Sequence, residues 1–178
     1  MGHRPRVQEK RKKIYNEEQI KPWAATHGLD LDALNLGFRN AVRQSFFSVP
    51  GDAGRKAALA RGIAGLYSGD TVLLWVFLTG VWDDRENEFL FQLLRRAVGE
   101  ERSLWEAESH VFGPDDRDYL EAFMAVCIYF TWDFLVVSSS GELFVAFDND
   151  SGLRVHGTNS SRVEGVYEFL DAMNIERM

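Results

Sequence analysis

The chain of 178 residues is 46% hydrophobic and 13% aromatic, which excludes a disordered protein and suits a single packed domain. Its one cysteine excludes an internal disulfide and a multi-cysteine metal site, and its longest apolar stretch, Thr71–Trp82, is shorter than the roughly 20 residues of a membrane span. The formal net charge of −7, together with a polar rather than apolar start, predicts an acidic cytoplasmic protein without a secretory signal.

The charge is unevenly distributed, because the start of the chain is strongly basic. Residues 1–13 contain one acidic residue, Glu9, and six basic ones: Arg4, Arg6, Lys10, Arg11, Lys12 and Lys13. We therefore divide the chain into a polar arm, residues 1–20, and one globular domain, residues 21–178. The arm has the charge to contact nucleic acid or an anionic surface, but it lacks interleaved aromatic residues on which bases stack. A solvated extension is the simpler interpretation.

Two helices are predicted at the start of the domain. In residues 30–46, Asp30 is the N-cap and apolar residues follow at helical spacing as far as Phe46. The next helix, residues 52–67, begins at Asp52. Its glycines at positions 62 and 65 weaken a helix but allow another helix to approach closely.

The apolar stretch Thr71–Trp82 has no polar side. As a helix it would be the buried central one, and a cap at Asp70 favours this interpretation. Its β-branched and aromatic residues would equally suit a buried strand, and periodicity does not separate the two. We predict a helix because the neighbouring segments are helical.

Two more helices are predicted before the sheet. One follows Asp83-Asp84, with its core stripe formed by Phe89, Leu90, Leu93, Leu94 and Ala97. The other follows Pro114-Asp115-Asp116, a typical helix start, and becomes wholly apolar towards Phe130. Its end should therefore pack beneath the sheet.

The stretch from Trp132 to Gly157 has the pattern of a three-stranded antiparallel meander. Strands at Phe134–Val137, Leu143–Phe147 and 153–157 are separated by short glycine-containing turns. The third alternates apolar and polar residues, as an edge strand does. A Ser161-x-x-Glu164 capping box then begins a last helix. The predicted fold class is α+β, with a helical N-terminal two-thirds followed by this meander and a C-terminal helix.

Neither a metal nor a cofactor is predicted. The segment Asp148–Gly152 has the composition of a calcium loop, but an EF-hand loop needs glycine at its sixth position and glutamate at its twelfth. Here glycine is fifth and Asn159 is twelfth, so the segment predicts a turn. The carboxylate pairs at 83–84, 100–101 and 115–116 begin predicted helices, where the helix dipole accounts for them.

No catalytic residue is predicted. Cys127 with His110 or His156 as its base would make a nucleophile, but the apolar neighbours of Cys127 predict a buried, inert thiol. Ser138, His156 and Asp133 could be combined into a triad, yet no serine lies in a Gly-x-Ser-x-Gly turn. A small hydrolase using His156 or Cys127 is therefore only a second alternative.

The expected function is protein binding without catalysis, as an acidic regulatory or immunity (antitoxin-like) protein with a basic partner. The candidate contact residues are Arg154 and His156, on the wet face of the edge strand, and Trp23, the tryptophan expected to be exposed. The same edge at 153–157 could join two copies of the chain. The alternative is an accessory protein that binds nucleic acid or an anionic surface through the basic arm.

Overall fold

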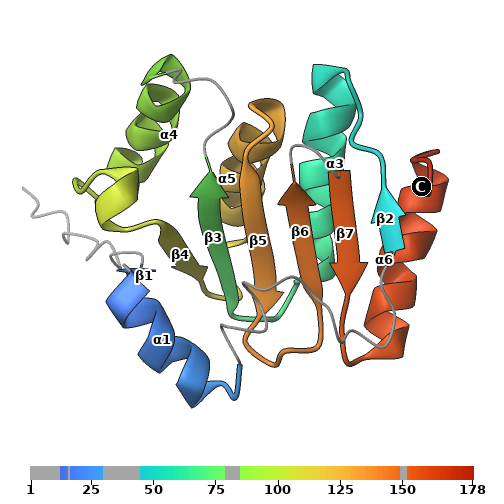
Figure 1. Cartoon of the computed structure of the whole chain (residues 1–178), viewed down its shortest axis with the longest axis horizontal. Coiled ribbons are helices and arrows are strands. Elements are labelled where there is room, and N and C mark those ends of the chain that lie inside the picture. The colour runs from blue at the N-terminus through green and yellow to red at the C-terminus, as the bar shows by residue number, and fades with distance from the viewer. Residues whose placement is uncertain (1–12, 16, 30–44, 79–84, 149–151) are drawn as a thin grey trace, which may run out of the picture.

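The computed structural model describes residues 13–15, 17–29, 45–78, 85–148 and 152–178, and Figure 1 shows how their helices and strands are arranged. Helices and strands alternate along much of the chain. In chain order the elements are β1 (Lys13–Tyr15), α1 (Glu17–Thr26), β2 (Ser45–Phe47), α3 (Ala53–Leu66), β3 (Val72–Leu78), α4 (Arg85–Ala97), the 3-10 helix η1 (Leu104–Glu106), β4 (Ser109–Phe112), α5 (Arg117–Tyr129), β5 (Asp133–Ser138), β6 (Phe144–Asp148), β7 (Gly152–His156) and α6 (Ser160–Ala172).

The strands form one seven-stranded sheet in the order β1-β4-β3-β5-β6-β7-β2, in which every neighbouring pair is antiparallel. The strands predicted between Trp132 and Gly157 are present as β5, β6 and β7, paired in that order. The class is α+β as predicted, but the predicted arrangement, a helical N-terminal two-thirds followed by a three-stranded meander, is wrong. The meander belongs to a larger sheet, and the N-terminal two-thirds contributes further strands interspersed with its helices.

The apolar stretch Thr71–Trp82 contains the strand β3, where we predicted a helix. β3 lies between β4 and β5, so that Val72 pairs with Phe112 on one side and with Ser138 on the other. A strand in this position is covered on both faces, and its sequence is therefore apolar without alternation. The β-branched and aromatic residues of the stretch suit this pleated, buried setting.

Strand β7 is an interior strand, where we predicted an edge. It pairs with β6 on one side and with β2 on the other, for example between Ser45 and Val155. Phe46, the end of the helix predicted over residues 30–46, lies in β2; residues 30–44 are outside the described residues. Because the backbone of β7 is already paired on both sides, joining two copies along 153–157 would require β2 to leave.

The outer side of β2 is occupied by the last residues of the chain. The Met178 amide donates to the Phe46 carbonyl at 2.9 Å, and the Ser48 amide donates to the Glu176 carbonyl at 2.9 Å. Between them, Arg177 forms an isolated antiparallel bridge with Phe47. Residues 176–178 therefore continue the sheet beyond β2.

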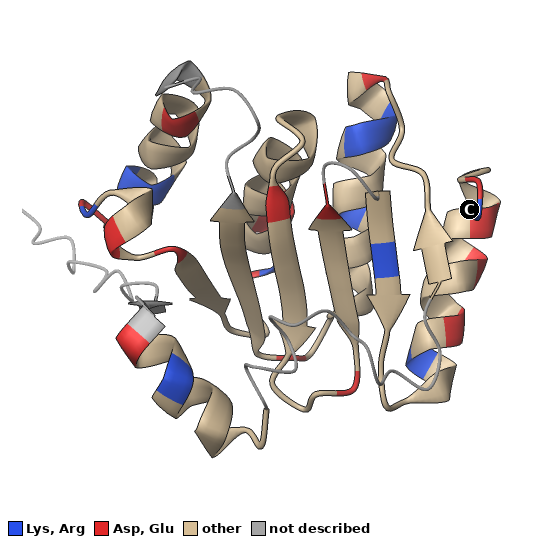
Figure 2. Ribbon diagram, in the orientation of Figure 1, with Lys and Arg blue, Asp and Glu red and all other residues tan. Residues whose placement is uncertain are grey.

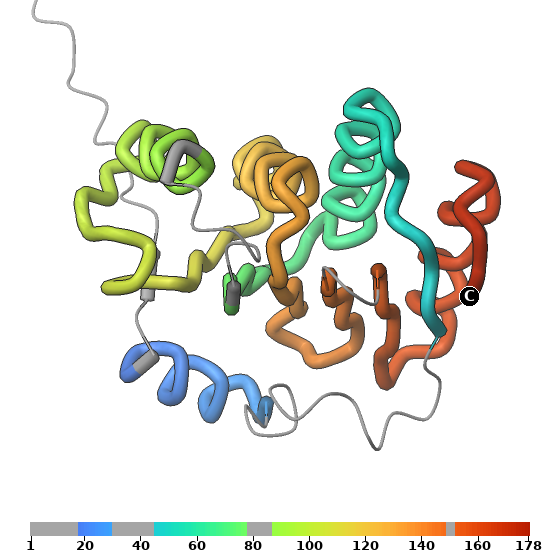
Figure 3. The backbone as a smooth tube through the Cα atoms, turned by 45° about the horizontal axis from the view of Figure 1, so that its top comes forward, coloured from blue at the N-terminus to red at the C-terminus, as the bar shows by residue number. Residues whose placement is uncertain are grey.

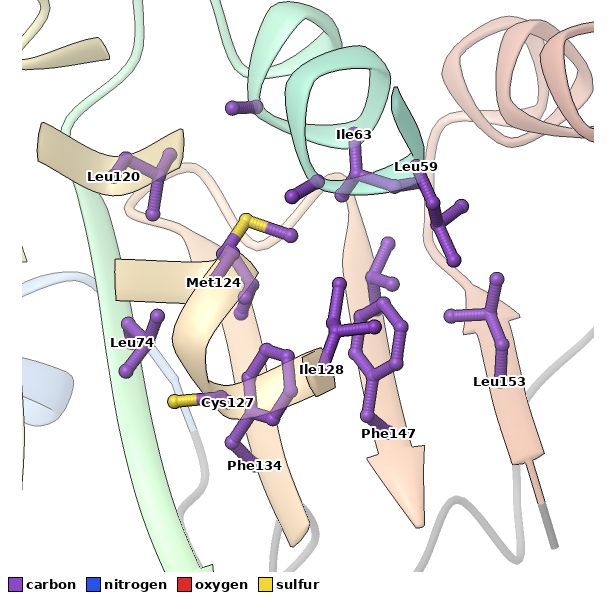
Figure 4. Close-up of a cluster of buried hydrophobic side chains, with 14 of the residues drawn as sticks. Leu59, Ile63, Leu74, Leu120, Met124, Cys127, Ile128, Phe134, Phe147 and Leu153 are labelled. Carbon is purple, nitrogen blue, oxygen red and sulfur yellow. The ribbon is translucent and has the colours of Figure 1, made fainter. Parts of the chain in front are cut away.

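The sheet separates two apolar layers. Helices α3, α4 and α5 lie on one face and α1 lies on the other (Figure 3). On β3, Leu74 and Val76 face the first group, whereas Leu73 and Trp75 belong to the cluster beneath α1. The larger cluster between helices and sheet is shown in Figure 4, and its labelled residues are Leu59, Ile63, Leu74, Leu120, Met124, Cys127, Ile128, Phe134, Phe147 and Leu153.

Residues near the start of the chain are part of this structure. Lys13–Tyr15, which fall within the predicted arm, form β1 and pair with β4. Ile20 and Trp23 of α1 pack on the sheet and are 0% and 9% exposed. The expectation that Trp23 is exposed is therefore wrong, because its indole covers the sheet face opposite the other helices.

Two helix starts illustrate how local polar residues set the boundaries. Asp52 caps α3 as predicted, its carboxylate accepting from the Arg55 amide at 2.8 Å. The start of α6 differs, because Asn159 caps it by accepting from the amides of Ser161 and Arg162. Ser161 is therefore inside the helix, and the predicted capping box does not begin it.

The small residues of α3 allow α6 to approach, and this predicts opposite effects for two glycines. A Cβ on Gly62 would lie 1.9 Å from the ring of Phe169, whereas one on Gly165 of α6 would meet open space. We expect Gly62→Ala to destabilise the protein by about 1–3 kcal/mol because the ring must move. Gly165→Ala should stabilise it by about 0.5–1 kcal/mol through helix propensity. Urea denaturation of both variants tests this, and changes of the same sign would contradict the packing of α3 on α6.

Candidate interaction site

Helix α4 has a buried face and an exposed apolar face. Phe91 and Arg95 lie one turn apart and are both 0% exposed. Phe89, Leu90 and Leu93 are 58%, 50% and 45% exposed. The prediction that these three residues form part of the core stripe is therefore wrong. We call Phe89, Leu90 and Leu93 the α4 surface.

Arg95 accounts for the orientation of α4. Its guanidinium donates to the backbone carbonyls of Ala107 at 2.8 Å, Ser103 at 3.2 Å and Arg102 at 3.3 Å. Burial lowers its pKa to about 10, so that the side chain remains charged at neutral pH. The guanidinium loses its hydration water on burial, and the three carbonyls replace that water as hydrogen-bond acceptors. Arginine, which usually lies on the surface, can therefore occupy the interior here.

These hydrogen bonds hold the segment that carries η1 against α4. Gln92 adds a hydrogen bond from its side-chain amide to the Arg102 carbonyl at 3.0 Å. Within the fixed segment, Trp105 is 53% exposed while its neighbour Leu104 is buried. The indole of Trp105 is therefore exposed to solvent on a segment of backbone that is hydrogen-bonded to α4.

The segment that follows α4 carries mostly negative charge on its surface. Glu101 and Glu106 are exposed on the segment after α4, and Arg96 is an exposed cation in the last turn of the helix. Arg102 is engaged by Glu100 at 2.7 Å. Figure 2 shows acidic residues on α4 and on the segment leading to β4, and basic residues on α4 as well. Exposed apolar side chains with charged neighbours are typical of a protein interaction site.

The buried face of α4 meets a cluster of aromatic rings that includes His110. The imidazole is 1% exposed and contacts Phe91 at 5.6 Å and Phe123 at 4.6 Å between ring centroids. Burial, with Arg95 as a further cause, lowers the pKa of His110 well below its usual value, so the ring is neutral. Among the described residues, neither ring nitrogen has a hydrogen-bond partner.

Neither of the two histidines considered as a base, His110 or His156, is placed to activate Cys127. It is 0% exposed, and burial raises the pKa of its thiol well above the ordinary value. Because both nitrogens of His110 lack hydrogen-bond partners, that ring does not activate the sulfur. Cys127 belongs to the cluster on the helix side of the sheet, whereas His156 stacks on Phe144 of the cluster on the α1 side. The structure does not bring Cys127 and His156 together.

Arg154 and His156 extend from the same face of β7, as the alternation predicts, but neither is freely solvated. Arg154 donates to the Asp148 carboxylate at 2.8 Å. The His156 ring lies parallel to Phe144 with 4.6 Å between centroids. Burial and, secondarily, the charge of Arg154 lower the pKa of His156 to about 4. Both side chains are therefore held by contacts within the sheet, and they do not form an open, solvated surface.

The remaining polar residues singled out from the sequence serve the backbone or lie outside the described residues. The Ser138 hydroxyl accepts from the amides of Glu142 and Leu143 and so closes the turn between β5 and β6. Asp133 begins β5. Of the basic arm residues, Arg4, Arg6, Lys10, Arg11 and Lys12 are outside the described residues, and Lys13 is in β1.

The sequence contained a signal for the true core face of α4. Phe91, Leu94 and Val98 are spaced by three and four residues and form a second apolar stripe, with Leu94 and Val98 packed against the main core. A helix that packs against one core needs only one apolar stripe, and this sequence has another one at Phe89, Leu90 and Leu93. The surplus stripe is the feature that could have identified the α4 surface.

Among the described residues, no group of three or more His, Cys, Asp or Glu side chains is placed to hold a metal ion. The helices described there are also too short or too polar to cross a membrane. In comparisons with known proteins, no family model, no curated protein and no solved structure matches this chain.

Proposed function

We propose that this protein acts by binding another protein through the α4 surface. The observation that carries the proposal is the exposure of Phe89, Leu90 and Leu93 on one helix. Exposing three large apolar side chains so close together leaves apolar surface in water, and a partner that covers them gains roughly 25 cal/mol for each Å² buried. A helix with an apolar face is a common recognition element in protein complexes.

The partner that fits best is basic. The whole chain has a formal net charge of −7, and the exposed carboxylates of Glu101 and Glu106 lie on the segment that Arg95 holds against α4. Complementary charge speeds association and disfavours acidic competitors. This combination suits a cytoplasmic regulatory or immunity (antitoxin-like) protein that covers a basic target. Binding rather than catalysis is also supported by the separation of Cys127 from His156 by the sheet.

A pair of matched double variants tests the proposal. Phe89→Ser/Leu93→Ser removes the apolar side chains of the α4 surface, and Tyr119→Ser/Tyr129→Ser removes two exposed rings from α5, which are 43% and 55% exposed. Both variants should fold, since none of the four positions is buried. A partner recovered with the native chain is then titrated against each variant by calorimetry. We expect the first variant to bind at least about 100-fold more weakly, as losing two central contacts implies, and the second to bind normally.

The salt and truncation dependence separates this proposal from binding by the basic arm. A basic protein partner should associate more slowly at high salt, with its apolar contacts retained. Equal binding of the native chain and the Phe89→Ser/Leu93→Ser variant would contradict the proposal. So would a native complex with nucleic acid at moderate salt that disappears when residues 1–12 are deleted, because the arm would then be the binding element.

A further inference from the structure

A cavity of about 370 Å³ opens where β6 ends and β7 begins. Its wall is formed by residues 48–51, which join β2 to α3, by Lys56 of α3, and by the end of α5. Ile128 and Phe147 supply buried apolar side chains to it. Cavities of a few hundred Å³ with apolar walls and a few polar groups are typical of small-molecule sites. This one is lined by elements other than α4 and is independent of the α4 surface.

The charge in this cavity is uneven. The carboxylate of Asp148 lines it but forms a salt bridge with Arg154 at 2.8 Å, so its negative charge is already balanced. The ammonium of Lys56 donates to the Tyr129 carbonyl at 3.2 Å and lies 5.8 Å from the centroid of the Tyr129 ring. No described carboxylate forms a salt bridge with Lys56. An ammonium has three donors, and a carbonyl uses one of them.

The backbone at the end of α5, which faces Lys56, has an unusual conformation at Thr131. Thr131, which lines the cavity, has a φ of 56°, a left-handed conformation that glycine or asparagine usually takes at this position after a helix. The amides of Thr131 and Trp132 donate to the carbonyls of Ile128 and Cys127 and thus close the end of α5. The carbonyl of Tyr129 remains directed to Lys56, which fixes the cation at the cavity.

From these observations we infer that the cavity binds a small molecule with an apolar body and an anionic group. The apolar body lies against Ile128 and Phe147, and the anion accepts hydrogen bonds from Lys56. A cationic ligand is disfavoured, because the carboxylate of Asp148, the only acidic side chain among the described residues that line the cavity, is bridged to Arg154. A carboxylate and a phosphate ester meet the same requirement, since Lys56 recognises charge rather than shape.

The inference is tested with three probes of equal chain length on the full-length protein: octanoate, octanol and octylamine. Each is titrated while amide chemical shifts are followed by NMR. We expect octanoate to bind most tightly and to shift the amides of Ile128 and Phe147. Lys56→Met should weaken octanoate binding by about tenfold or more, because a hydrogen bond to a charged group is lost. Lys56→Arg, which keeps the charge, should bind much closer to the native chain.

Arg61→Met provides the matched control, because it removes a cation from the same helix, one that pairs with Glu121 and is exposed. It should bind octanoate normally. The inference is wrong if octanoate leaves the cavity amides unshifted, if octanol or octylamine binds as tightly, or if Lys56→Met binds as well as the native chain. Shifts confined to Leu90 and Leu93 would equally overturn it, since the probe would then occupy the α4 surface. The Phe89→Ser/Leu93→Ser variant should retain octanoate binding.

Discussion

Replacing Phe123 with alanine is expected to lower the free energy of unfolding by about 3–5 kcal/mol. The ring is 0% exposed and contacts Phe91 at 5.2 Å, Phe112 at 5.3 Å and His110 at 4.6 Å between centroids. It therefore connects α5 to both α4 and β4. Removing it leaves a cavity that these rings can fill only in part, and the edge-to-face contacts are lost as well.

Urea denaturation followed by circular dichroism measures this loss. Tyr119→Ala on the same helix is the control, because the Tyr119 side chain is 43% exposed, and its effect should stay within about 1 kcal/mol. A loss below about 1 kcal/mol for Phe123→Ala would show that α5 does not pack on β4 and α4 as described. Such a result would also remove the support on which the α4 surface rests.

Acid should destabilise the protein between pH 6.5 and 5, with His110 as one main cause. The unfolded chain binds a proton at His110 below its ordinary pKa of about 6.5, whereas burial keeps the pKa of the folded ring well below that value. Only the unfolded state is protonated in this window, so stability falls as the pH falls. One such group accounts for roughly 1.4 kcal/mol per pH unit, or about 2 kcal/mol over the window. His156, whose folded pKa is about 4, acts in the same direction.

Denaturation curves at several pH values test this expectation, with His110→Leu as the decisive variant. Leucine has no proton to bind and suits the apolar surroundings of Phe91, Phe112 and Phe123. The variant should lose part of the pH dependence and be more stable than the native chain at pH 5. It also removes two ring nitrogens that find no hydrogen-bond partner in the described part of the chain. An unchanged slope in the variant would mean that His110 is protonated or exposed in the folded state.

The parts of the fold that the sequence predicted are those with local signals. The turn after Ser138 separates β5 from β6, and Gly141 there adopts the positive φ that such a turn requires. Gly152, which begins β7, also has a positive φ, while residues 149–151 lie outside the described residues. Asp52 marks the start of α3 through a side chain that bonds three residues ahead. In each case the residues that determine the structure are neighbours in the sequence, so the local sequence is sufficient to predict the element.

The elements that were missed depend on distant partners. β2 contains only Ser45–Phe47, and its pairing with Leu153–Val155 joins segments that are far apart in the sequence. β3 is a strand because β4 and β5 supply hydrogen bonds on both sides, which its own composition does not reveal. An apolar segment buried on all sides has the same sequence pattern in either conformation.

The candidate sites were harder to predict than the fold, and for a related reason. Helical spacing of apolar residues predicts that Phe89, Leu90 and Leu93 face the core. The structure instead buries Arg95, whose guanidinium donates to three backbone carbonyls of a later segment that spacing along α4 does not reveal. The cavity at Lys56 is assembled from the loop between β2 and α3, from α3, from the end of α5, and from β6 and β7. Its residues come from segments that are far apart in the sequence, so the spacing of residue types along the chain does not predict the cavity.

The pairing of residues 176–178 with β2 has a consequence for how this protein behaves at high concentration. A free strand edge is a template for another chain and thus a starting point for aggregation, and proteins commonly protect edges with charges, prolines or bulges. Here the protection is a short piece of backbone, held by hydrogen bonds of 2.9 Å from Met178 and to Glu176. We therefore expect the colloidal stability of the molecule to depend on this segment, whose Arg177 side chain also lies over the rings of Phe47 and Tyr167. Shortening the chain there should expose the edge of β2.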